Sequence, residues 1–161
     1  MATTRNKPVT PKAKPAEIRI TIGEFTDVLG TGKPITDFSL ALAKRNPNVS
    51  VDGDTIHVKY PKTTVRFTLA SSAGDKINFY PAGITFVLKS DCATTEASRL
   101  GLQNFPQNKI RLDGESLSIT DNYLHVKNTI TYKFSLVVQR GSDGKIGIID
   151  PGISNNNANP R

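Results

Sequence analysis

Apolar residues occupy every second position in the stretch TITYKFSLVVQ, residues 129–139. The apolar set that shares one face is Ile130, Tyr132, Phe134, Leu136 and Val138. A period of two fits a β-strand with one buried face, whereas apolar positions on a helix recur every three or four residues. Residues 64–69 repeat the pattern, with Val65, Phe67 and Leu69 on one side. We therefore expect strands to dominate the fold.

Several other segments have the composition of short strands. These are residues 17–22, 77–79, 84–88, 124–126 and 145–149. Residues 36–45 fit a strand or a helix, and we favour a strand because their neighbours are strands. One short helix is expected over residues 90–101, which open with a Ser-Asp cap and close with Gly101. Many short strands separated by Gly and Pro turns favour an all-β fold, a β-sandwich of two antiparallel sheets.

Two similar stretches, VSVDGDTIHV at 49–58 and IRLDGESLSI at 110–119, each contain an Asp-Gly pair. Asp-Gly between alternating apolar residues is a strong signal for a β-hairpin with a two-residue loop. We therefore expect chain reversals at Asp52-Gly53 and Asp113-Gly114.

These loops predict a register for each hairpin. The first would pair Val51 with Asp54 and Val49 with Ile56, and the second would pair Leu112 with Glu115 and Ile110 with Leu117. Each hairpin precedes a similar strand, TVRFTL at 64–69 and TYKFSL at 131–136. The internal likeness thus spans a hairpin and the next strand, twice.

The positive charge of the chain is unevenly placed. The net charge is +7, and residues 1–16 supply +4 of it through Arg5, Lys7, Lys12 and Lys14 without any acid. We expect residues 1–16 to be a disordered basic tail, residues 17–153 a single domain, and residues 154–161 a disordered Asn-rich tail. A basic tail can attract phosphates, so weak nucleic-acid association through it is one alternative function. Four positive charges are few for a surface that binds nucleic acid, so a nucleic-acid partner is not expected.

Composition points to a cytoplasmic protein. A single cysteine, Cys92, cannot form an intramolecular disulfide, so nothing indicates an oxidising compartment. No apolar run approaches the roughly 20 residues that a membrane span needs. The first residues also lack the apolar segment of a secretory leader. We therefore expect no membrane partner.

The Gly-rich stretch LGTGKPIT, residues 29–36, resembles a phosphate-binding loop only superficially. That loop needs a glycine five positions before Gly32, where Asp27 stands, and a hydroxyl residue after Lys33, where Pro34 stands. We interpret the stretch as a Gly-rich connection.

The sequence offers no catalytic, metal or cofactor site. His57 and His125 alternate with apolar neighbours, so both should face away from the core, and two histidines with Cys92 are too few for a tetrahedral zinc site. Cys92 has no readable base partner that would make it a nucleophile. Asp52 and Asp54 are too few for a calcium loop. We expect no enzyme activity and no cofactor.

Aromatic residues near strand ends and three long loops support a second alternative. Tyr60, Tyr80 and Tyr123 could line a binding rim, although packing in turns is the commoner role. The long loops are residues 24–37, 70–83 and 89–109, where functional groups often gather. A carbohydrate or small-molecule binding protein, or an enzyme with a loop-built site, is therefore a second possibility.

The segment YKFSLVVQRGSDGKIGIIDPGISN, residues 132–155, resembles the closing segment of the small bacterial DP-EP family. In that family a strand and a short hairpin are followed by an Asp-Pro element and then a Glu-Pro element. Asp150-Pro151, Ile153 and Asn155 match, and the resemblance extends upstream through PAGITF at 81–86. The Glu-Pro element has no match, since the nearest candidate is Asn159-Pro160.

The resemblance implies an immunoglobulin-like β-sandwich of bacterial origin and carries no catalytic residue over. Independently of the family, Pro151 should end a strand at a sheet edge and Asp150 should cap neighbouring backbone. The first functional hypothesis is a non-enzymatic module that acts by binding or assembly. Its expected contact surface is an exposed edge strand, with a second copy or another protein as partner.

Overall fold

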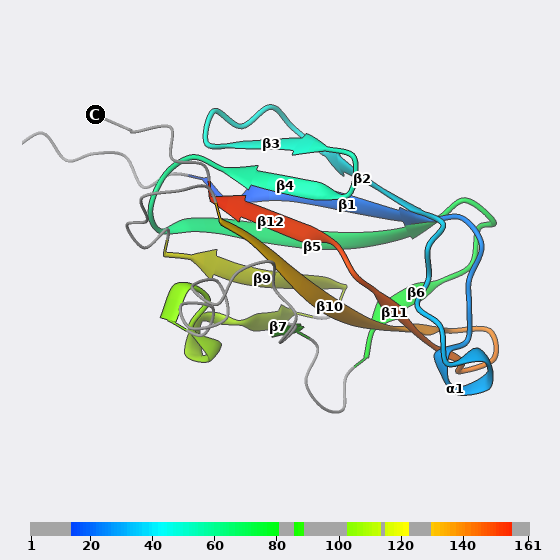
Figure 1. The fold of residues 1–161 in the computed structure, drawn as a ribbon. Coiled ribbons are helices and arrows are strands. Elements are labelled where there is room, and N and C mark those ends of the chain that lie inside the picture. The colour runs from blue at the N-terminus through cyan, green and yellow to red at the C-terminus, as the bar shows by residue number, and fades with distance from the viewer. Residues whose placement is uncertain (1–13, 81–85, 89–102, 114, 123–129, 156–161) are drawn as a thin grey trace, which may run out of the picture.

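Two β-sheets face each other in the computed structural model, which describes residues 14–80, 86–88, 103–113, 115–122 and 130–155 (Figure 1). The first sheet has the strand order β2-β1-β5-β9-β8. Its strands are β1 (Ala16–Ile22), β2 (Phe38–Leu42), β5 (Thr63–Ser71), β8 (Arg111–Asp113) and β9 (Ser116–Asp121).

The second sheet has the order β11-β10-β12-β4-β3, with β6 and β7 also paired to β10. Its strands are β3 (Val49–Asp52), β4 (Thr55–Val58), β6 (Ile77–Phe79), β7 (Phe86–Leu88), β10 (Ile130–Arg140), β11 (Ile146–Ile149) and β12 (Gly152–Asn155). The predicted all-β sandwich of two sheets is confirmed. Both sheets are mixed rather than purely antiparallel, because β1 runs parallel to β5 and β12 runs parallel to β4.

Alternating burial along β10 agrees with the predicted period of two. Tyr132, Phe134, Leu136 and Val138 are buried, and the intervening residues from Thr131 to Val137 are half-buried. β5 follows the same rule through Val65 and Phe67, which are both fully buried. The inward faces of the two sheets therefore supply one apolar core.

Most of the predicted strands are present. Residues 17–22, 77–79 and 145–149 correspond to β1, β6 and β11, and residues 36–45 contain β2, as favoured over a helix. Of residues 84–88, the structure describes β7 at 86–88. The strand predicted at 124–126 and the helix predicted at 90–101 lie outside the described residues. A helical turn that was not predicted, α1 (Val28–Thr31), interrupts the Gly-rich connection, and a short 3-10 helix (Gln107–Lys109) precedes β8.

Both predicted hairpins form, but their registers differ from the prediction. β3 and β4 pair Val51 with Ile56 and Val49 with Val58, so the two-residue loop is Gly53-Asp54 rather than Asp52-Gly53. Gly53 has a positive φ of 58°, which suits the first central position of a type II′ turn. β8 and β9 show the same displacement, because Asp113 pairs with Ser116. The physical reason is that this register places apolar residues opposite apolar residues in both hairpins.

The Asp-Pro element joins β11 and β12 without changing their register against β10. Ser135 lies opposite Asp150, and its hydroxyl donates to the Asp150 carboxylate at 2.6 Å. The Phe134 N–H donates to the Pro151 carbonyl at 3.2 Å. β11 ends just before this element as expected, but β12 continues in the sheet interior between β10 and β4. Pro151 therefore does not mark a sheet edge, whereas the backbone cap expected of Asp150 remains a prediction.

The strands extend slightly beyond the predicted domain limits. β1 begins at Ala16, which is buried, one residue before the predicted start of the domain. β12 continues to Asn155, and both Ser154 and Asn155 are buried although we assigned them to the C-terminal tail.

Candidate functional site

Five exposed cations gather at the end of the sandwich where β1 begins. They come from the start of β1 (Lys14), the β2–β3 connection (Lys44, Arg45) and the β4–β5 connection (Lys59, Lys62). β1 is antiparallel to β2 and parallel to β5, so these three places meet at one end of the sheets. Residues 43–48 and 59–62 contain no acid. We call these five residues the basic end.

The opposite end of the sandwich lies beside α1 in Figure 1, and its acids and bases nearly balance. Its three connections span residues 23–37, 72–76 and 141–145. They carry the acids Glu24, Asp27, Asp37, Asp75 and Asp143 and the bases Lys33, Lys76 and Lys145. Arg140, which ends β10 and binds Asp143, adds a fourth base. With five acids and four bases, this end lacks the positive excess of the basic end, and an anionic partner is attracted to the basic end instead.

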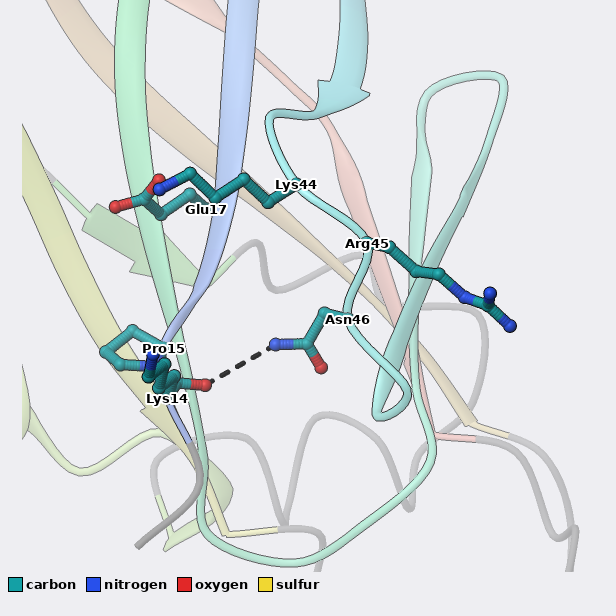
Figure 2. Close-up of a pocket in the computed structure, with 6 residues that line it drawn as sticks. All are labelled: Lys14, Pro15, Glu17, Lys44, Arg45 and Asn46. Atoms are coloured by element: carbon teal, nitrogen blue, oxygen red, sulfur yellow. Dashed lines mark hydrogen bonds between the residues drawn. The ribbon is translucent and has the colours of Figure 1, made fainter.

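A pocket of about 230 Å³ lies at the basic end (Figure 2). It is lined by Lys14, Pro15, Glu17, Lys44, Arg45 and Asn46. Three of these side chains are cationic and one is acidic, so the lining has an excess of two positive charges. Lys44 and Arg45 extend in opposite directions from successive positions in Figure 2. They therefore widen the positive surface around the pocket.

Hydrogen bonds hold the pieces of the basic end together. The Asn46 side-chain amide donates to the Lys14 carbonyl at 3.4 Å, and the Asn46 side-chain oxygen accepts from the Asn48 N–H at 2.9 Å. The Asn48 carbonyl in turn accepts from the Lys59 N–H at 2.9 Å. This chain of bonds connects the start of β1, the β2–β3 connection and the end of β4. It fixes the backbone that carries the cations.

The β4–β5 connection presents an aromatic ring beside two of these cations. Tyr60 is 42% exposed and stands in the sequence Lys59-Tyr60-Pro61-Lys62. The Thr63 hydroxyl donates to the Tyr60 carbonyl at 2.7 Å, and Lys62 has a positive φ of 56°. This left-handed conformation costs a non-glycine residue about 1–2 kcal/mol. Tyr60 lies two residues after the end of β4, as predicted, and it is not among the residues that line the pocket; its place on a binding rim stays a prediction.

A buried polar cluster lies beneath this end, where β9 and β12 finish. The Asp121 carboxylate accepts from the side-chain amide of Asn104 at 2.8 Å and from that of Asn155 at 2.6 Å. The Asn104 amide also donates to the Asn155 side-chain oxygen at 3.0 Å. All three residues are buried. The cluster links the two sheets, since β9 belongs to one and β12 to the other.

Of the other sequence candidates, those that the structure describes lie outside the lining of the pocket at this end. His57 lies on β4 between buried neighbours and is half-buried, and its Nδ1 atom is buried without a hydrogen bond. The Asp54 carboxylate lies 3.7 Å from the Lys133 ammonium. Tyr80 follows β6 and is half-buried. Cys92, His125 and Tyr123 lie outside the described residues.

Neither a phosphate loop nor a metal cluster is present in the part of the chain that the structure describes. Residues 28–31 form α1, which Asp27 caps through the Leu29 N–H and which ends at Gly32 in a left-handed conformation. No described helix is long and apolar enough to span a membrane.

Residues 15–157 match the model of the DP-EP family. No curated protein matches the chain.

Proposed function

The chain belongs to the DP-EP family, and from that premise we propose that it is a non-enzymatic β-sandwich module that binds an anionic partner at its basic end. The observation that carries the proposal is that Lys14, Lys44 and Arg45 line a pocket of about 230 Å³. Lys59 and Lys62 lie at the same end of the sandwich, outside the lining of this pocket. The sequence before Lys14 adds Arg5, Lys7 and Lys12. Clustered charge of one sign raises the local concentration and the association rate of a partner of opposite sign.

A non-enzymatic role is supported by three of the described acids, whose carboxylates bind other side chains of the fold. Asp143 binds Arg140, Asp150 accepts from Ser135, and Asp121 accepts from two buried amides. A general acid or base must reach a substrate, so acids committed to such contacts are poor candidates.

The pocket is a better binding surface than the sheet edges. Among the described strands, those at the ends of the sheet orders or paired on one side only have three to five residues: β2, β3, β6, β7, β8 and β11. Short edge strands are a common way of preventing strand addition. Assembly of copies through these edges is the other form of the proposal. It would appear as a mass that rises with concentration in light scattering.

Charge reversal at the two ends of the sandwich tests the proposal. The variant with Lys44→Glu and Arg45→Glu should elute from a heparin column at lower salt than the unaltered protein. The matched control carries Lys33→Glu and Lys76→Glu, two exposed residues at the opposite end, and changes the net charge equally. The control should retain more of its binding. Equal losses in both variants would mean that net charge alone controls retention, and the proposal would be wrong.

A second pocket supports the alternative of small-molecule binding. It has a volume of about 190 Å³, lies at the opposite end, and is lined by Thr21, Gly23, Asp37, Phe38, Ser39 and Ser72. Three hydroxyls and a carboxylate suit a polyhydroxyl ligand such as a sugar. The Asp37 carboxylate already accepts from the Glu24 N–H at 2.8 Å, which reduces its capacity for a ligand. A thermal-shift screen with simple sugars tests this alternative, and a rise in Tm that Asp37→Asn abolishes would favour it.

The proposal includes a cytoplasmic location, which the single cysteine supports. Bacterial origin and an immunoglobulin-like arrangement of strands are further expectations that come from the family resemblance.

A further inference from the structure

Tyr60 is unusual among the exposed apolar side chains at the surface. Three large hydrophobic residues are exposed in the described part of the chain: Leu29, Tyr60 and Leu112. Tyr60 is the aromatic one, and it stands between Lys59 and Lys62 at the basic end. A chain of hydrogen bonds through Asn48 and Asn46 links the β4–β5 connection, which carries Tyr60, to the pocket. A ring and a set of cations thus share one surface.

The backbone that carries Tyr60 is fixed. The Thr63 hydroxyl holds the Tyr60 carbonyl, the Lys59 N–H is bound to Asn48, and Pro61 restricts its own φ. Lys62 keeps a strained left-handed conformation in the same turn. Strain of this kind gathers at ligand-binding sites, where it forms part of the pre-organised geometry. Because the backbone of this turn is already ordered, it would lose little conformational entropy when a ligand stacks on the Tyr60 ring.

We propose that the anionic partner is single-stranded nucleic acid, an inference that rests on the proposed function of the basic end. The five cations contact backbone phosphates, and the Tyr60 ring stacks on one unpaired base. Positive grooves with an exposed aromatic side chain are the usual design of proteins that bind single strands without sequence preference. This partner was not expected from the four charges of the tail alone; the fold brings Lys44, Arg45, Lys59 and Lys62 beside Lys14.

A single strand fits these groups better than the other polyanions. A duplex keeps its bases stacked on each other, so Tyr60 would find no free base face. Among the described helices, α1 has four residues and lies at the opposite end, so none can enter a major groove. An acidic polypeptide satisfies the cations but brings no base to stack on Tyr60.

Fluorescence anisotropy with a labelled oligothymidylate of about 12 nucleotides tests the inference, with the matching oligouridylate, a duplex and polyglutamate as comparisons. The logarithm of the binding constant should fall with that of salt concentration with a slope of about −3.5 if all five cations contact phosphates. This slope corresponds to a loss of about 100-fold between roughly 50 and 200 mM salt. Tyr60→Ala should weaken binding at least about 5-fold, and Tyr60→Phe should not, because the ring remains.

The outcomes separate this inference from the proposed function. Tight oligonucleotide binding that depends on the Tyr60 ring and exceeds duplex binding supports both. If polyglutamate and duplex bind as tightly as the single strand and Tyr60→Ala has no effect, the proposal of an anion-binding surface at the basic end is supported and the single-strand inference is overturned. If none of the polyanions binds at low salt, both are overturned. Binding that survives Lys44→Glu and Arg45→Glu would also exclude this surface.

Discussion

Phe67 and Phe134 contact each other across the two sheets, with ring centroids 5.8 Å apart and ring planes at 50°. Phe67 is the fourth residue of TVRFTL on β5, and Phe134 is the fourth residue of TYKFSL on β10. The two similar strands thus place equivalent rings against each other in the core. Each strand lies in the sheet opposite to the hairpin that precedes it. The internal likeness of the sequence therefore places one of the two similar strands in each sheet. The strand pairing around them differs, because β9 pairs directly with β5 whereas β12 separates β4 from β10.

The aromatic pair predicts a large and coupled effect on stability. Phe67→Ala and Phe134→Ala should each lower the free energy of unfolding by about 3–5 kcal/mol, because each removes a fully buried ring. In a double-mutant cycle measured by urea denaturation, the coupling should be about 0.5–1.5 kcal/mol. Leu29→Ala, at a residue 82% exposed, is the control and should change stability by less than about 0.5 kcal/mol. Strict additivity of the two ring deletions would contradict the contact.

The strands could be predicted from sequence because burial on one face imposes a period of two. The register of the hairpins also follows from the sequence, but from the pairing of apolar residues across the two strands rather than from the Asp-Gly dipeptide. Shifting the loop from Asp52-Gly53 to Gly53-Asp54 pairs Val49 with Val58 and Val51 with Ile56, all of which face inward. Matching of apolar residues across strands thus prevails over the preference of a dipeptide for one turn type.

The basic end could not be predicted, since its residues are scattered between positions 14 and 62 and come together only through strand order. The parallel pairing of β1 with β5 brings Lys14 near the β4–β5 connection. No short sequence pattern predicts that these two strands pair. The buried cluster around Asp121 was missed for the same reason. The sequence around Asn104 and Asn155 predicts polar loop residues. Only the folded structure shows that both side chains bind Asp121.

Gly147 should not tolerate a side chain. A Cβ atom at this position would lie 2.5 Å from Ile35 Cδ1 and 3.1 Å from Phe25 Cζ. Gly147→Ala should therefore destabilise the protein by about 1–3 kcal/mol, measured by urea denaturation. Adding Ile35→Val removes the closest atom, so the double variant should lose less than the sum of the two single changes. If the stability losses of the two single changes simply add in the double variant, the close approach of Ile35 to position 147 does not determine the loss caused by Gly147→Ala.

The ion pair in the β10–β11 turn predicts a titration at low pH. The Arg140 guanidinium donates to both Asp143 carboxylate oxygens, at 3.1 and 2.7 Å. This bond lowers the pKa of Asp143 from 3.8 to about 2. Because the pKa is depressed in the folded state, the pair stabilises the fold above pH 3.8, and this contribution is lost as the pH falls through about 2.

Carboxyl carbon NMR measures this pKa directly. Arg140→Gln should return the pKa of Asp143 toward 3.8, and Arg140→Lys, which keeps the charge but not the paired donors, should give an intermediate value. A pKa that stays near 2 in Arg140→Gln would show that another group is responsible.

The buried cluster predicts that Asp121 is more important for stability than an exposed acid. Asp121→Ala removes the acceptor of two buried amides, so the free energy of unfolding should fall by about 2–6 kcal/mol, at roughly 1–3 kcal/mol for each affected group. Asp54→Ala is the control, since Asp54 is exposed and lies 3.7 Å from Lys133. Its effect should stay below about 1 kcal/mol. Similar losses in the two variants would argue against a structural role for the cluster.

The strained backbone at Lys62 predicts that glycine will be tolerated there and a β-branched residue will not. Relief of about 1–2 kcal/mol of strain is partly offset by the extra freedom of glycine in the unfolded chain, roughly 0.5–1 kcal/mol. Lys62→Gly should therefore leave thermal stability unchanged or slightly raised, whereas Lys62→Val should lower it, since a branched side chain rarely adopts a φ of 56°. Lys33→Gly is the control, because Lys33 is exposed and has no positive φ. Glycine there relieves no strain and adds freedom to the unfolded chain, so this variant should lower the Tm of the protein. If Lys62→Gly and Lys33→Gly lower the Tm equally, Lys62 is not strained, and pre-organisation of the Tyr60 turn loses one of its supports.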